Sequence, residues 1–312
     1  MSLSVADLAL RQGRIGASEI AALVGEDSFQ SPLDLWLKKT GRVKDEPSTQ
    51  SEWGHRIEGL VADQFAQKHG VTLAKTPTLT CDLFPLAAAT PDRLIVGQPA
   101  CLEAKNVGYR MMHKWRVGSD GWRAPAYVQL QGQWQCMVGG FDRFHVAAFL
   151  GGRDDYDEAF AYDPQLAGEL YEIAAKFWRD HVLADRQPDP TNSAKDREYL
   201  ARRYPTTTGN LLSSTEEIDA LARQYAAART AAKEAKSGKD EAQNKLQDRI
   251  GEQGGYAAPW GQVTWLPKAK GSTAWAKVAV EAGADAALIA KHTKAPGRAF
   301  SLKFGDEDDG DE

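Results

Sequence analysis

The residues with the clearest chemical potential are two acids and a lysine on or beside two short β-type runs. Asp92 ends the string TPD, and Glu103 and Lys105 lie in the string LEAK. Side chains of a strand alternate between its faces, so Glu103 and Lys105 point the same way. A hairpin that pairs the two runs brings Asp92 beside Glu103. The spacing therefore predicts two carboxylates and one amine on a single face.

Carboxylates held this close repel each other and shift their pKa values unless a cation lies between them. Mg²⁺ suits such a site because it accepts hard oxygen ligands and leaves positions for water and phosphate, and Mn²⁺ is a possible substitute. The ion would polarise a scissile phosphate and activate a water, while Lys105 would orient that water or stabilise developing charge. The alternative is a turn cap at Asp92 and an exposed pair of Glu103 and Lys105.

Two flanking helical segments add polar side chains to this cluster. Glu58 lies near the start of a helix whose apolar positions recur at helical spacing, where it could add a metal ligand or merely complement the helix dipole. Gln129 and Gln133 follow the acids and share one helical face at i, i+4. They could face the cluster or the solvent.

The remaining pattern predicts an α/β domain with a central mixed sheet flanked by helices, because strands and helices alternate along the chain. The predicted strands are 76–81, 86–90, 94–96, 100–104 and 145–150, and the predicted helices include 125–138 and 164–183. A turn at 97–99 joins the two strands that carry the acids. Residues 216–250, rich in Ala, Lys and Glu, predict a long helix or a helical hairpin interrupted at 237–238.

The amino-acid composition excludes some classes of protein but does not show whether the protein binds nucleic acid. The net charge is −5, but the tail GDEDDGDE holds six acidic residues and no basic ones, so total charge neither supports nor excludes nucleic acid. Three cysteines without CxxC spacing argue against a disulfide framework or a zinc site. No run approaches the roughly 20 apolar residues that cross a bilayer. We therefore expect a cytoplasmic protein without membrane contact.

Five motifs in order resemble the YqaJ-type viral recombinase family, which is related to lambda exonuclease within the PD-(D/E)XK nuclease superfamily. They are RIGASEIAALVGEDSFQSPLDLWLKKTG, WGHRIEGLVADQFA, TPDRL, LEAK and YVQLQGQWQCMVGG. The resemblance covers roughly residues 10–185. It implies a restriction-endonuclease-like core over 1–205. A mainly helical extension over 206–304 and a disordered acidic tail over 305–312 would follow.

The resemblance also implies a role for individual residues. Those implied as metal ligands are Asp92, Glu103, Glu58 and, in less distinctive surroundings, Asp82. Lys105 corresponds to the catalytic lysine and Gln129 to the glutamine of the QxQ helix. Arg11, Ser18 and Thr90 resemble the residues that hold a 5′-terminal phosphate. The chain departs from the family at Arg93, where a glycine is usual, and this could alter the turn or add a phosphate contact.

The function implied by the resemblance is digestion of one strand of linear duplex DNA from 5′ to 3′. The remaining 3′ single strand would serve phage-type homologous recombination in a bacterial host cell. Expected partners are double-stranded DNA ends, a single-strand-annealing protein and further copies of the chain, a trimer by resemblance. Two alternatives stay open. One is a structure-selective or nicking endonuclease on the same core, and the other is a non-catalytic DNA-binding adaptor.

Overall fold

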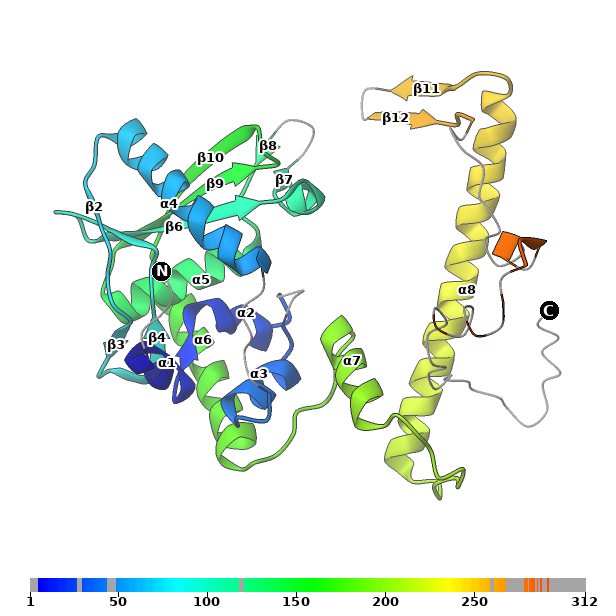
Figure 1. The fold of residues 1–312 in the computed structure, drawn as a ribbon, viewed down its shortest axis with the longest axis horizontal. Coiled ribbons are helices and arrows are strands. Elements are labelled where there is room, and N and C mark those ends of the chain that lie inside the picture. The colour runs from blue at the N-terminus through cyan, green and yellow to red at the C-terminus, as the bar shows by residue number, and fades with distance from the viewer. Residues whose placement is uncertain are drawn as a thin grey trace. The chain divides into compact units, whose positions relative to one another are not determined.

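The computed structural model describes residues 5–26, 30–43, 49–117, 121–258 and 261–267, and single positions between 278 and 291. The chain divides into two compact units, residues 1–200 and 201–312. Figure 1 shows the elements of each unit. The predicted acidic tail, 305–312, lies outside the described residues. Within the described part of the chain, no helix is long and apolar enough to cross a membrane.

A five-stranded mixed sheet forms the centre of the first unit, as the sequence predicts. In spatial order its strands are β10 (Asp154–Ala161), β9 (Arg143–Leu150), β6 (Ala100–Val107), β5 (Arg93–Ile95) and β2 (Leu73–Ala74). Strands β6 and β9 are parallel, and the other neighbours are antiparallel. The parallel pair is connected through a helix, which is the usual way that such strands are joined.

A three-stranded sheet carries the N-terminal residues of interest. It consists of β1 (Ile15–Gly16), β4 (Phe84–Ala89) and β3 (Leu79–Cys81), in that order. The pairing of β1 with β4 is parallel and places Ile15 beside Ala87. This pairing fixes the segment after residue 14 next to the strand that leads to Thr90 and Asp92.

Two helices cover opposite faces of the central sheet. Helix α4 (Thr49–His69) packs against alternate residues of β6, among them Leu102. Cys101 and Glu103, which alternate with them, face α5 (Ala126–Gly139). Figure 1 shows both helices alongside β6 and β9. Because alternation is strict in a strand, the acidic side of β6 is the side that α5 covers.

The other elements of the first unit surround this core. The helical ones are α1 (Val5–Gln12), η1 (Ala17–Glu19), α2 (Ile20–Leu23), α3 (Pro32–Lys39), η2 (Tyr109–Lys114), α6 (Pro164–Phe177), η3 (Trp178–Leu183) and α7 (Ala194–Arg203), which runs past the boundary of the unit. A small hairpin of β7 (Arg116–Val117) and β8 (Gly121–Trp122) precedes α5. Helix α5 ends at Gly140, whose φ of 66° is a left-handed C-cap.

The second unit contains one long helix, α8 (Glu216–Ile250), and the hairpin β11 (Gly255–Ala258) and β12 (Gly261–Thr264). Thr215 caps the helix by accepting a hydrogen bond from the Ile218 amide. Of the two predicted arrangements, the long helix is confirmed and the helical hairpin is not, because α8 continues through Gly238. A glycine costs only about 1 kcal/mol in a helix interior, and the surrounding Ala, Lys and Glu residues favour helix.

Candidate active site

The β5–β6 hairpin brings the two predicted acids together. Arg93 pairs with Leu102, so the preceding residue, Asp92, lies level with Glu103 on the neighbouring strand. The Ala104 amide donates a hydrogen bond of 2.8 Å to Asp92 Oδ2, which fixes this carboxylate beside β6. The local cause is the turn at residues 97–99, where Gly97 has a φ of 78° that a glycine adopts without strain.

Glu103 is the most tightly held carboxylate of the cluster and is only 3% exposed. Its Oε1 accepts from Lys105 Nζ at 2.5 Å and from Gln131 Nε2 at 2.6 Å. Its Oε2 accepts from Gln135 Nε2 at 2.6 Å. Lys105 also donates to Gln131 Oε1 at 3.2 Å. A carboxylate with three charge-assisted or amide donors is fixed in orientation, so its burial is compensated.

The glutamines at the cluster are not the ones that the sequence predicts. Gln129 donates to the Ala124 carbonyl at the start of α5, and Gln133 bonds to the backbone near the start of α6. Residues two apart on a helix are turned by roughly 200°, so Gln131 and Gln135 occupy the face opposite to the predicted pair. Gln131, and not Gln129, therefore contacts Glu103. Four alternating glutamines give two i, i+4 pairs, and the sequence offers no signal that selects one.

The electrostatics of the cluster show a deficit of positive charge. Burial, the charge of Glu103 and the charge of Glu58 raise the pKa of Asp92 well above its ordinary value, against the opposing effects of Lys105 and the Ala104 amide. Burial lowers the pKa of Lys105, but Glu103 and Asp92 outweigh it and the net pKa is raised. Lys105 is thus a firmly held cation, and a second cation would relieve the remaining repulsion.

A hydrated magnesium ion fits this donor set. Among the described residues, no three His, Cys, Asp or Glu side chains are grouped so that they could hold one ion together. Mg²⁺ does not need three, because it usually keeps several waters and binds one or two carboxylates together with substrate phosphates. Asp92 and Glu103 supply that pair. Glu58 is near enough for its charge to act on Asp92 and Lys105.

Asp82 does not belong to this cluster. It lies on the exposed turn between β3 and β4, whereas Asp92 follows the other end of β4. The six residues of β4 separate the two positions, a length of roughly 20 Å at about 3.3 Å per residue. The structure therefore does not bring Asp82 to the carboxylate pair.

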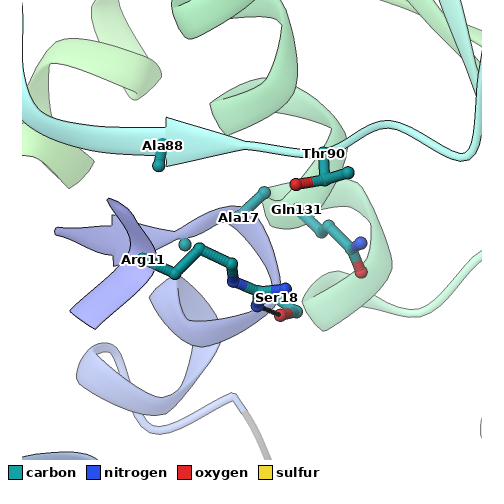
Figure 2. A pocket seen from close by; sticks show the side chains of 7 residues that line it. Arg11, Ala17, Ser18, Ala88, Thr90 and Gln131 are labelled. Carbon is teal, nitrogen blue, oxygen red and sulfur yellow. Dashed lines mark hydrogen bonds between the residues drawn. The ribbon is translucent and has the colours of Figure 1, made fainter. Parts of the chain in front are cut away.

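A small pocket of about 40 Å³ adjoins the cluster and is lined by residues from five elements and by Thr90, which follows β4. Its walls are Arg11, Gly16, Ala17, Ser18, Ala88, Thr90 and Gln131. Figure 2 shows the Arg11 guanidinium beside the Ser18 hydroxyl, and Thr90 and Gln131 across from them. Arg11 Nη2 donates to Ser18 Oγ at 3.4 Å. The three residues that the resemblance implies for a phosphate thus line one pocket.

The polar groups of this pocket suit an oxyanion. A guanidinium and hydroxyls are donors, and none of the described residues that line the pocket is acidic. Thr90 is further placed by a hydroxyl contact of 3.0 Å with Thr78. Gln131 lines the pocket and also bonds to Glu103, so one side chain joins the pocket to the carboxylate cluster. Arg93 does not line this pocket, and its guanidinium donates to the Asp92 carbonyl.

The raised pKa of Asp92 predicts how the metal-free protein responds to pH. A carboxyl whose pKa is higher in the folded state stabilises the protein most below its ordinary pKa of 3.8, and this contribution is lost as pH rises through the folded value. We expect Asp92→Asn to raise the melting temperature by a few degrees at neutral pH in EDTA. The gain should shrink as pH is lowered toward 4.

The same substitution should remove the stabilisation that Mg²⁺ gives to the wild type, because one of the two ligands is then uncharged. Thermal unfolding of both proteins, with EDTA and with Mg²⁺, measures the effect. An Asp92→Asn variant that is less stable than the wild type in EDTA, or equally stabilised by Mg²⁺, would contradict the assigned electrostatics. Asp142→Asn is a control outside the cluster.

The sequence comparisons agree on one family. Residues 8–142 match the family model of the YqaJ-like viral recombinase domain. The chain is also 27% identical over 260 residues to the uncharacterized protein YqaJ of Bacillus subtilis (strain 168). That alignment covers 80% of this chain and 81% of the relative.

A solved structure shares the fold at low sequence identity. The chain is similar to LHK-Exo in complex with dAMP, with a TM-score of 0.50 and 16% identity over 64% of this chain and 97% of that one. LHK-Exo is an alkaline exonuclease from Laribacter hongkongensis. A phage-related exonuclease from Haemophilus somnus 129PT gives a TM-score of 0.40 and 11% identity over 55% of this chain and 96% of that one. The resemblance inferred from the motifs is confirmed by the match of residues 8–142 to the YqaJ-like viral recombinase domain.

Proposed function

We propose that the protein is a magnesium-dependent deoxyribonuclease that digests one strand of linear duplex DNA from its 5′ end. The observation that carries the proposal is the junction at Gln131, which joins an oxyanion pocket to a pair of buried carboxylates. An oxyanion pocket beside a carboxylate pair that would hold a divalent cation suits a substrate with consecutive phosphates. LHK-Exo, which has a similar fold, is described as an alkaline exonuclease, and this agrees with the proposal.

In the proposed reaction, Asp92 and Glu103 hold the divalent cation, with Mn²⁺ as a possible substitute for Mg²⁺. The chemistry that a bound ion would supply is polarisation of the scissile phosphate and a lowered pKa for the attacking water. Gln131 and Gln135 keep Glu103 in one orientation. Lys105 stays protonated, so it donates hydrogen bonds to the phosphate oxygens or orients the attacking water.

In this proposal, the pocket sets the direction in which the enzyme digests the strand. Arg11, Ser18 and Thr90 would hold the 5′-terminal phosphate, and the next phosphate along the strand would then meet the carboxylate pair. Cleavage there removes nucleotides from the 5′ end and leaves a 3′ single strand. We propose that such strands serve a single-strand-annealing protein in phage-type recombination inside a bacterial host. Processivity would follow if several copies of the chain encircle the duplex.

A single assay tests the proposal against its alternatives. End-labelled linear duplexes, with or without a 5′-phosphate, are incubated with the protein in Mg²⁺ and in EDTA, beside covalently closed circular DNA. We expect mononucleotide release from linear DNA in Mg²⁺ only, and intact circles. Cleaved circles would favour an endonuclease. Absence of any divalent-dependent release would favour a non-catalytic adaptor.

Arg11→Ala should chiefly abolish the preference for phosphorylated ends. The guanidinium is the only charged group that lines the pocket, and its loss should reduce the rate on 5′-phosphorylated ends by about 10²-fold. The rate on 5′-hydroxyl ends should change little. Arg153→Ala, at an exposed turn after β9, is the matched control. If Arg11→Ala lowers the rate equally on both kinds of end, the assignment of the pocket as a 5′-phosphate site is contradicted.

A further inference from the structure

A buried lysine lies behind the pocket and has no part in the chemistry assigned so far. Lys39 ends α3, and its side chain is only 4% exposed. Its Nζ lies 2.7 Å from Glu19 Oε2 and donates to the Arg11 carbonyl at 2.8 Å. Burial lowers the pKa of Lys39, and the contact with Glu19 opposes that effect. The lysine is therefore held by a carboxylate and by the backbone of a pocket residue.

Glu19 connects the lysine to the other side of the pocket. Its Oε2 accepts a hydrogen bond of 2.7 Å from the Gly16 amide, and Gly16 lines the pocket. Residues 11 and 16 are the two ends of the turn between α1 and η1. One ion pair thus ties both ends of the turn that carries Arg11 and leads to Ser18.

A second contact fastens the same two helices. The Gln12 side-chain amide, Nε2, donates to the carbonyls of Lys38 and Lys39, at 2.8 and 2.9 Å. Gln12, at the end of α1, thus donates to backbone carbonyls of α3, and Lys39, at the end of α3, donates to the Arg11 carbonyl of α1. These contacts restrict the turn, because the Arg11 carbonyl and the Gly16 amide at its two ends are both bound by side chains of the ion pair.

Stability alone is a poor explanation for such a pair. Desolvation of two buried charges costs about as much as their attraction returns, and apolar replacements are often neutral or stabilising. A geometric role explains the arrangement better. Glu19 also lies close to the pocket, since a Cβ built on Gly16 would be 3.3 Å from both Glu19 Oε2 and Arg11 Nη2. Without Lys39, the charge of Glu19 would act against a bound phosphate.

We propose that Lys39 and Glu19 are a positioning pair that holds the pocket in shape and screens it from a negative charge, an inference that rests on the proposed 5′-phosphate site. Lys39 positions Arg11 through its carbonyl, and Glu19 positions Gly16 through its amide. Neither side chain lines the pocket itself. The pair acts on recognition of the phosphorylated end and leaves the carboxylate cluster unchanged.

The test compares rates and affinities for duplexes with a 5′-phosphate and with a 5′-hydroxyl. Lys39→Met should reduce the preference for phosphate by about tenfold or more, since it disorders the turn and exposes the site to Glu19. Lys39→Arg should retain most of it. Lys39→Met combined with Glu19→Gln should recover part, because the glutamine is uncharged and its carbonyl still accepts from Gly16. Affinities are measured in EDTA, so they do not require cleavage.

Ser31→Ala is the matched control because it weakens the other end of the same helix. Ser31 caps α3 by accepting from the Asp34 amide and donates to buried Asp196. Ser31→Ala should lower the melting temperature and leave the preference for 5′-phosphorylated ends unchanged. Lys39→Met with an unchanged preference, or Ser31→Ala with the same loss, would overturn the inference. A wild type that binds and degrades both ends equally would instead overturn the proposed function of the pocket.

Discussion

Lys105→Ala is expected to reduce cleavage of linear duplex DNA by at least about 10²- to 10³-fold, the loss typical when one preorganised donor to a developing charge is removed. Lys105 Nζ donates to both Glu103 and Gln131, so it lies at the junction of the carboxylate pair and the pocket. Its raised pKa keeps it charged across the whole working range of pH. No other lysine among the described residues has these contacts.

The variant should remain folded, because Glu103 keeps its hydrogen bonds to Gln131 and Gln135. Single-turnover rates on labelled duplexes measure the loss, and circular dichroism checks the fold. Lys68→Ala is the matched control, since Lys68 also pairs with carboxylates, Asp157 at 2.5 Å, but at the far end of α4. A Lys105→Ala protein with the wild-type rate would refute the assigned site.

Gly132→Ala is expected to have the largest effect on stability. A Cβ at this position would lie 2.1 Å from Cδ2 of Phe144, a ring that is fully buried on β9. Helix α5 can therefore approach the sheet only with a glycine here. Overpacking typically costs about 1–3 kcal/mol and occasionally more, and we expect the upper end because ring and helix are both enclosed. An added Cβ would push α5 away from the sheet, and this displacement would also move Gln131 and Gln135 away from Glu103.

Denaturant unfolding and the cleavage rate measure the two consequences. Gly168→Ala, inside α6, is the matched control because a Cβ there meets no atom within 4 Å. That change should stabilise the protein by about 0.5–1 kcal/mol, the usual gain for Ala over Gly in a helix. A Gly132→Ala protein with wild-type stability and activity would contradict the proposed link between close packing and the geometry of the site.

The acids were predictable because strand geometry is simple. The period of two places Glu103 and Lys105 on one face, and a short turn sets the register that brings Asp92 beside them. Arg11, Ser18 and Thr90 were reached through the resemblance, and no local pattern links positions so far apart in sequence. Parallel pairing of β1 with β4 is the long-range contact that joins them.

Other features depend on packing that the sequence does not encode locally. The rotation of α5 about its axis decides between two pairs of glutamines, and that rotation is set by Gly132 against Phe144. Asp82 is near Asp92 in sequence, but the extended strand β4 lies between them and separates them in space. Lys39 resembles any lysine at a helix end, and only its contacts with Glu19 and Arg11 distinguish it.

The central claim is that Asp92 and Glu103 together hold one divalent cation beside the phosphate pocket. Crystals soaked in Mn²⁺ test this claim directly, because the anomalous signal locates the ion without reference to activity. We predict one peak between the two carboxylates, and no peak there in Asp92→Asn crystals treated in the same way. A wild-type crystal with Mn²⁺ bound elsewhere and none between Asp92 and Glu103 would contradict it.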